Sequence, residues 1–131
     1  MSFSVTLDSV ERPQIGWANK QGFGSQLGQL GELKGVGEEG HSIALDGLRG
    51  GVCFHGAVHT PLDALTLQAG SVVTCDRHGE MCRWLVDGRE VAAVKAADTG
   101  MSGTYLCHWS DPRPAISGKG LWRVTHYAFE K

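Results

Sequence analysis

Apolar and polar residues alternate with a period of two in many short segments of this chain. In Phe3–Leu7, for example, every second residue is apolar, so an extended backbone places these side chains on one face. The 19 glycines supply turns between such segments. No stretch repeats its apolar residues with a convincing helical period. We therefore expect strands at Phe3–Leu7, Gln14–Ala18, Ser42–Leu45, Gly51–His55, Ser71–Cys75, Cys82–Val86, Glu90–Val94, Thr104–Trp109 and Leu121–Phe129.

Tight turns between these strands favour antiparallel pairing. Asp87-Gly88 lies between two apolar segments, and a two-residue hairpin turn of this composition takes a positive φ at both central residues. Asp46-Gly47 is a second turn signal. Short strands without an amphipathic helix predict an all-β antiparallel sandwich or barrel with little or no helix. Within it, Trp17 and Trp84 belong to strands of alternating pattern and are expected in the core.

Length and charge narrow the class of protein further. A chain of 131 residues corresponds to a single domain, here residues 1–131. The net charge of -2 gives no basic field for a phosphate backbone, so we expect no nucleic-acid partner. No apolar run is long enough for a membrane span, and Met1–Val10 lacks the features of a secretory signal. We therefore expect a cytoplasmic or nuclear protein, not a secreted one, with reduced cysteines.

The segment Asn19–Gly40 differs from the rest of the chain. Its 22 residues include seven glycines and show no sustained period. Two interpretations stay open: a functional loop, or an irregular connection with a short helical turn near Leu27–Leu33. The letters of Gly35–Gly40 fit a dinucleotide-binding fingerprint, but a short strand follows where a helix is needed, and two glutamates would repel a pyrophosphate.

The cysteines and histidines show no strong catalytic or metal-binding pattern. With a hairpin turning at Arg77–Glu80, Cys75 and Cys82 would face each other, where they could bind a metal or form a bridge. Buried cysteine is also a common small apolar residue, and this is the reading we adopt. No local pattern places a nucleophile beside a histidine base. We therefore expect no enzymatic activity, no metal and no cofactor.

Several of these segments, in order, resemble the SPRY domain family. Six motifs carry the resemblance. The first three are an opening strand with an aromatic-x-Val-Thr pattern, an Ile-Gly-Trp-Ala strand and a stretch that ends in Asp-Gly. The other three are an aromatic-His-Gly step, a Gly-x-Val-Val-x-Cys strand and an Asp-Gly hairpin. These motifs lie at Phe3–Leu7, Gln14–Ala18, Val36–Gly47, Phe54–Gly56, Leu67–Asp76 and Arg83–Val91. Gly103–Cys107 stands at the place of the family's Tyr-Pro-Ala-Val strand, and Leu121–Phe129 at that of its closing strand.

The resemblance implies a bent sandwich of two antiparallel sheets acting as a non-enzymatic protein-interaction module. In this family, loops at one end of the sandwich bind a short peptide or a protein loop. Phe54 replaces the aromatic hydroxyl that peptide-binding members place before the histidine, and the loop Trp109–Trp122 precedes the closing strand. We expect a monomeric domain whose contact residues are Arg49, Phe54, His55, Trp109 and Arg113.

The alternative class is a carbohydrate-binding, lectin-like sandwich. Galectin-type sugar sites need a His-x-Asn-x-Arg run together with a Trp–Glu pair. Here His41-Ser42-Ile43 breaks the run at its third residue, and no Trp-x-x-Glu occurs. The sequence therefore favours a protein or peptide ligand over a sugar.

Overall fold

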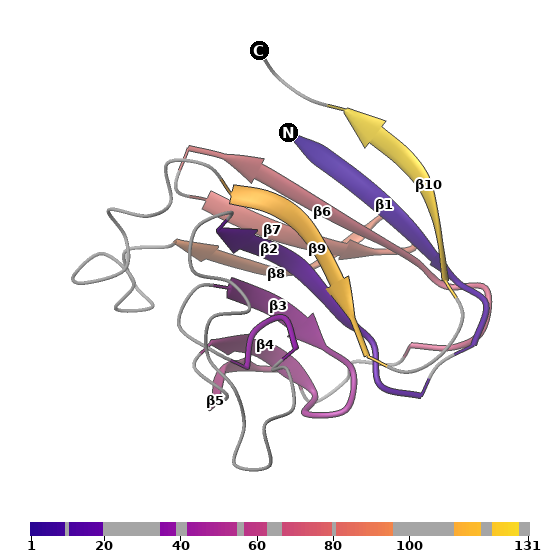
Figure 1. Cartoon of the computed structure of the whole chain (residues 1–131), viewed down its shortest axis with the longest axis horizontal. Helices are drawn as coiled ribbons and strands as arrows, with labels where there is room; N and C mark the ends of the chain where they lie inside the picture. Colours follow the sequence, from indigo (N-terminus) through magenta and orange to yellow (C-terminus); the bar gives the residue numbers. More distant parts are fainter. Residues whose placement is uncertain are drawn as a thin grey trace.

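The computed structural model describes most of the chain as strands joined by short turns (Figure 1). The described residues are 1–9, 11–19, 35–38, 42–54, 57–62, 67–79, 81–95, 112–118 and 122–128. They contain ten strands and no helix. The strands are β1 (Ser2–Leu7), β2 (Gln14–Asn19), β3 (Ser42–Asp46), β4 (Gly51–Phe54), β5 (Ala57–Pro61), β6 (Val72–His78), β7 (Met81–Val86), β8 (Arg89–Lys95), β9 (Pro112–Ser117) and β10 (Trp122–Ala128).

The strands form two antiparallel sheets packed face to face. Sheet A has the order β10-β1-β6-β7-β8, and sheet B has the order β5-β4-β3-β2-β9. In each sheet a strand from the beginning of the chain lies beside one from its end, because β1 pairs with β10 and β2 pairs with β9. The predicted all-β, two-sheet antiparallel sandwich is confirmed.

Local turn chemistry is also as predicted. Asp87 has a φ of 51° and Gly88 a φ of 81°, as the two-residue hairpin between β7 and β8 requires. The main-chain N–H of Val72 donates to Oδ1 of Asp87 at 2.9 Å, which ties this turn to the start of β6.

Large side chains from both sheets fill the space between them. Trp17 and Trp84 are fully buried, so the predicted core position of both is confirmed. The ring of Phe3 meets that of Trp17 edge to face, with centroids 5.1 Å apart. The indole N–H of Trp84 in sheet A donates to the carbonyl oxygen of Ile15 in sheet B at 2.9 Å. The indole N–H is buried away from water, so losing this acceptor would leave it unpaired at a cost in free energy. The hydrogen bond therefore helps to fix the position of one sheet relative to the other.

Two strands lie where the sequence pattern did not place them. β5 follows β4 without a strong alternation of its own, and β9 occupies much of the segment expected to be the loop Trp109–Trp122. The loop assignment is therefore wrong for Pro112–Ser117. Its prolines resemble a turn signal, but at a sheet edge they need no hydrogen-bond partner. The strand expected at Thr104–Trp109 lies outside the described residues.

The hairpin between β6 and β7 corrects the expected cysteine pair. His78 pairs with Met81, so β6 continues two residues further than expected and the turn has two residues in place of four. Cys75 then faces Trp84 and Cys82 faces Arg77, which means that the two cysteines are not directly opposite each other. Both are buried and free, so their predicted place in the core is confirmed.

The outer face of sheet B is covered by a short part of the Asn19–Gly40 segment. Gly16, Ala44 and Cys53 follow one another across β2, β3 and β4 on this face. Because these side chains are small, residues 35–38 lie close against the sheet: a Cβ on Gly37 would stand 3.2 Å from the Cβ of Ala44. Val36 is 1% exposed in this third layer.

Candidate functional site

The predicted contact residues that the structure describes are divided between the two ends of the sandwich. Arg49 lies in the turn between β3 and β4, whereas Phe54 ends β4 at the opposite end. The four residues of β4 separate them by roughly 10 Å at about 3.3 Å per residue. Arg113 pairs with Ala18 near the end of β2 and therefore lies at the same end as Phe54. His55 and Trp109 lie outside the described residues.

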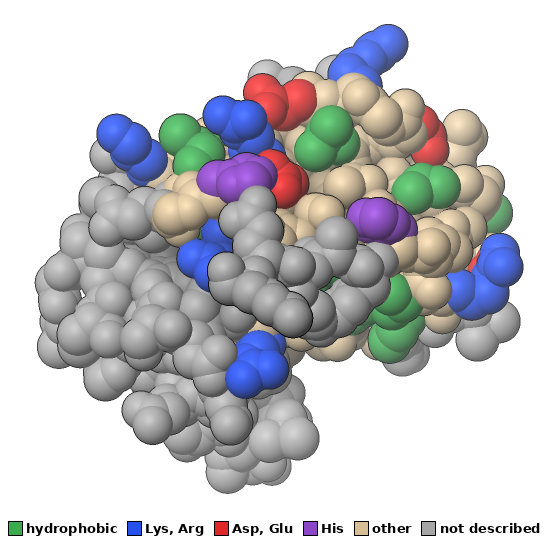
Figure 2. All heavy atoms as spheres, turned by 90° about the horizontal axis from the view of Figure 1, so that it is seen from above, with side chains coloured by type: hydrophobic (Ala, Val, Ile, Leu, Met, Phe, Trp, Pro, Cys, Tyr) green, Lys and Arg blue, Asp and Glu red, His purple; other side chains and the backbone are tan. Residues whose placement is uncertain are grey.

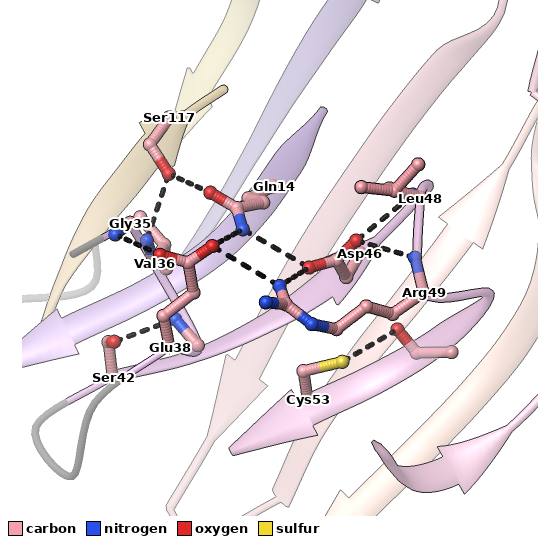
Figure 3. A network of polar contacts seen from close by, with 12 residues as sticks. Gln14, Gly35, Val36, Glu38, Ser42, Asp46, Leu48, Arg49, Cys53 and Ser117 are labelled. Carbon is pink, nitrogen blue, oxygen red and sulfur yellow. Dashed lines mark hydrogen bonds and ion pairs between the residues drawn. The ribbon is translucent and has the colours of Figure 1, made fainter. Parts of the chain in front are cut away.

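At the first end, Asp46 organises the β3–β4 turn (Figure 3). Its carboxylate is fully buried. The main-chain N–H groups of Leu48 and Arg49 donate to Oδ1 at 3.0 and 2.8 Å, and Nη1 of Arg49 donates to Oδ2 at 2.7 Å. The side chain that forms the turn therefore also holds the guanidinium, so the position of Arg49 is set by buried contacts.

Glu38 and Gln14 extend this network across sheet B. Nη1 of Arg49 also donates to Oε1 of Glu38 at 3.2 Å. Nε2 of Gln14 donates to the same oxygen at 2.8 Å and to Oδ2 of Asp46 at 3.1 Å. Two carboxylates thus share one guanidinium and one amide, which supply the donors that buried acceptors need.

The network also fixes the main chain of residues 35–38. The Oγ of Ser117 on β9 donates to Oε1 of Gln14 at 2.7 Å and accepts the N–H of Val36 at 2.8 Å. On the other side, the N–H of Gly37 donates to Oγ of Ser42 at 2.7 Å. Glu38 closes the turn by accepting the N–H of Gly35 at 2.7 Å. These contacts fasten residues 35–38 to β2, β3 and β9; we call this set of hydrogen bonds the clamp.

The electrostatics of the clamp favour its charged form. Burial raises the pKa of Glu38, but hydrogen bonds from Gly35, Gln14 and Arg49 outweigh it and hold the pKa below its ordinary value of 4.5. The hydrogen bond to Asp46 raises the pKa of Arg49, and Glu38 adds to this effect against desolvation. Glu38 and Arg49 are therefore both charged at neutral pH, as their ion pair requires.

The clamp leaves part of the turn accessible. Leu48 is 57% exposed and the Arg49 side chain 31% exposed, while Asp46 beneath them is buried. Within the part of the chain that the structure describes, the Arg49 guanidinium makes both of its hydrogen bonds through Nη1. This end can therefore offer an apolar side chain and a held guanidinium on a firm turn.

Sequence reasoning recognised only parts of this arrangement. Asp46 was identified as a turn residue and Arg49 as a contact candidate, but Gln14, Glu38 and Ser117 had no assigned role. Their partners are distant in sequence, with 103 positions between Gln14 and Ser117. A pattern of neighbouring residues carries no signal for such a contact.

The end with Phe54 and Arg113 combines an exposed cationic side chain with aromatic side chains that are buried at the rim of the core. Phe54 is 8% exposed at the rim of the core, and Arg113 is exposed on β9. The guanidinium carbon of Arg77 lies 5.9 Å from the centroid of the Trp17 ring, within reach of a cation–π contact. Nε of Arg77 and the indole N–H of Trp17 are buried without a hydrogen-bond acceptor in this structure.

Cysteine chemistry is suppressed in the described core. Burial raises the pKa of Cys82 to about 12 and that of Cys53 to about 11. Burial also raises the pKa of Cys75 well above its usual range. Thiolate is the reactive form, so these three thiols are poor nucleophiles in the folded protein.

Neither a metal cluster nor a membrane helix is found in the described ranges. No three histidine, cysteine or acidic side chains there lie close enough together to hold a metal ion. No helix in the same residues has the length and hydropathy to cross a bilayer. Figure 2 shows basic and acidic side chains interspersed on the face seen from above.

Comparison with known proteins adds no identification. No family model matches the chain, and no curated protein matches it. The fold is therefore established by the structure, whereas the resemblance to the SPRY family stays a prediction from the sequence.

Proposed function

We propose that this protein is a non-enzymatic interaction module that binds a peptide or a protein loop at the end of the sandwich carrying Phe54 and Arg113. The proposal rests first on the fold. In a sandwich, the core is held by the sheets, so the segments at an end can vary to suit a ligand without disturbing it.

One observation carries the choice of this end. Arg113 is exposed at this end on β9, Phe54 reaches the same end from β4, and Arg77 of sheet A packs there over the buried Trp17 of sheet B. Tryptophan and arginine are the residues most enriched in binding hot spots, because they combine large apolar area with directional donors. Of the other predicted contacts, His55 follows Phe54 directly in the sequence, and Trp109 precedes Arg113 by four positions.

A quantitative affinity purification from native cell lysate tests the proposal. The baits are the wild-type chain, a Trp109→Ala/Arg113→Ala double variant, and Arg89→Ala as a matched control. Arg89 begins β8 beside the Asp87-Gly88 turn, at the opposite end of the sandwich. We expect a protein that wild type and Arg89→Ala retain and that the double variant loses, with all three baits folded by circular dichroism.

The interface is then measured with the purified partner by calorimetry. Truncation of a hot-spot residue costs about 2 kcal/mol or more, so the double variant should bind at least about thirtyfold more weakly. Equal retention by all three baits would move the site away from this end. Retention of glycans alone, on a glycan array, would favour the lectin-like alternative.

A further inference from the structure

The four edge strands of the two sheets are not equally protected against pairing with another strand. On sheet B, β9 contains Pro112 and Pro114, and β5 ends with Pro61. Proline has no N–H to offer an incoming strand. On sheet A, β8 carries Arg89 and Lys95 among its exposed residues. Charged side chains and prolines are the usual means by which proteins keep sheet edges from pairing.

The fourth edge, β10, lacks this protection. Its sequence from Trp122 to Ala128 contains no proline and one arginine. That arginine, Arg123, is held by its own chain: Nε donates to Oδ2 of Asp8 at 2.9 Å and Nη2 to Oδ1 at 3.0 Å. Its charge is therefore paired and does not guard the edge. Figure 1 shows β10 as the outermost strand of sheet A.

The exposed side chains of β10 continue the core face of sheet A beyond the sandwich. Trp122 pairs with Leu7 and Val124 pairs with Val5, so each lies on the same face as a fully buried partner. Nevertheless, Trp122 is 39% exposed and Val124 is 52% exposed. They are two of the four large hydrophobic residues exposed among the described residues. A strand added outside β10 would place its own side chains beside both.

We infer that β10 is a docking edge for an extended peptide segment of a partner, which adds antiparallel to sheet A and packs alternate apolar side chains against Trp122 and Val124. A peptide must be extended to form hydrogen bonds with the backbone groups of an edge strand. Because Trp122 and Val124 are two positions apart, the peptide must also have apolar residues at every second position. This surface is separate from the end of the sandwich proposed above, and the two proposals can fail independently.

The size of the edge favours a peptide over a second copy of this chain. β10 has seven residues, and its register with β1 shifts between Ser4 and Val5, which leaves Thr125 as an extra residue. The regular register is therefore interrupted at Thr125, and residues 122–124, which include Trp122 and Val124, form a short stretch separate from residues 126–128. Two copies meeting edge to edge over so short a stretch would fall well below the roughly 1,200 Å² of a stable interface.

A synthetic peptide of alternating valine and threonine with a lysine at each end tests this inference on the full chain. The readout is the backbone amide spectrum and hydrogen exchange, residue by residue, with up to about 1 mM peptide. We expect shifted and newly protected amides within Trp122–Val124. A peptide of the same sequence with every amide N-methylated should give no such change, because it cannot form the ladder.

Paired variants assign the effect to the edge. Val124→Lys should weaken binding about tenfold or more, since it puts a charge on the docking face. Ala93→Lys makes the same kind of change on the exposed face of β8 and should bind like wild type. Equal binding of the peptide by all three proteins would overturn the inference, as would absence of any amide change in β10. If the protein without peptide formed dimers with rising concentration and the β10 amides were protected in them, the inference would also be overturned, because the edge would then bind a second copy of this chain.

Discussion

Replacing Asp46 by asparagine tests whether the clamp stabilises the fold as its geometry indicates. The substitution keeps the shape of the side chain but exchanges one acceptor oxygen for an N–H₂ donor. In the structure, Oδ1 accepts two main-chain N–H groups of the turn, and Oδ2 accepts Nη1 of Arg49 and Nε2 of Gln14. Whichever way the amide is turned, two donors then face a donor.

The magnitude follows from those contacts. A hydrogen bond to a charged group contributes about 1.5–3 kcal/mol, and a buried donor left unpaired costs about 1–3 kcal/mol. The Arg49 side chain is 31% exposed, so water recovers part of its loss. We therefore expect Asp46→Asn to lower the free energy of unfolding by about 3 kcal/mol, a large share of the roughly 5–15 kcal/mol typical of a domain.

Urea denaturation followed by tryptophan fluorescence measures this change. With a slope of about 1.5 kcal/mol per molar urea, the midpoint should fall by about 2 M. Asp87→Asn is the matched control, because Asp87 is an exposed turn residue whose φ of 51° suits asparagine equally well. It should change the unfolding free energy by less than about 0.5 kcal/mol.

A double-mutant cycle with Arg49→Met separates the ion pair from the turn. If the pair contributes as argued, the coupling energy between the two substitutions should be about 1 kcal/mol or more. A loss below about 1 kcal/mol for Asp46→Asn, or a coupling energy near zero, would refute the reasoning. The clamp would then be a consequence of the fold and not a source of its stability.

Four further measurements follow from the same structure. The clamp holds the pKa of Glu38 below 4.5. The contribution of the Glu38 carboxylate to the free energy of unfolding is therefore complete above its unfolded-state pKa and is lost as pH falls through its folded-state pKa. Glu38→Gln should remove this dependence and flatten the acid limb of a plot of stability against pH. Trp84→Ala should cost about 3–5 kcal/mol in urea denaturation, since it removes a fully buried side chain and its bond to Ile15; a loss near 1 kcal/mol would contradict the register. Gly16→Ala should destabilise by about 2–3 kcal/mol, because its Cβ would meet the carbonyl oxygen of Ile43. Finally, peptide mapping after iodoacetamide at pH 8 should find Cys82 unmodified in the native protein and modified in urea, as its raised pKa of about 12 requires.

Features set by neighbouring residues could be predicted from the sequence. The β7–β8 hairpin follows from Asp87-Gly88 and the alternation on either side, and both tryptophans expected in the core are there. The β6–β7 hairpin shows the limit of this reasoning. A turn of two residues in place of four moves the facing positions, so Cys82 meets Arg77 and not Cys75.

Features that depend on distant partners could not be predicted. β9 contains prolines that read as turn residues, and only its place at the edge of sheet B makes them compatible with a strand. The clamp is similar, because Gln14, Glu38 and Ser117 become partners only when β2, β9 and residues 35–38 are assembled. Such contacts are properties of the topology.

Arg49 illustrates how a residue type can indicate binding and still act within the fold. Its guanidinium is engaged by Asp46 and Glu38, so a ligand at that turn would compete with two carboxylates already in place. Arg113 is exposed on an edge strand, at the end where Arg77 packs over Trp17. Removing a guanidinium should therefore act mainly on stability at the Arg49 turn and mainly on affinity at Arg113. The two ends of the sandwich therefore differ: buried charge at Asp46 holds residues 35–38 against sheet B at one end, and the other end is the one that we propose for partner binding.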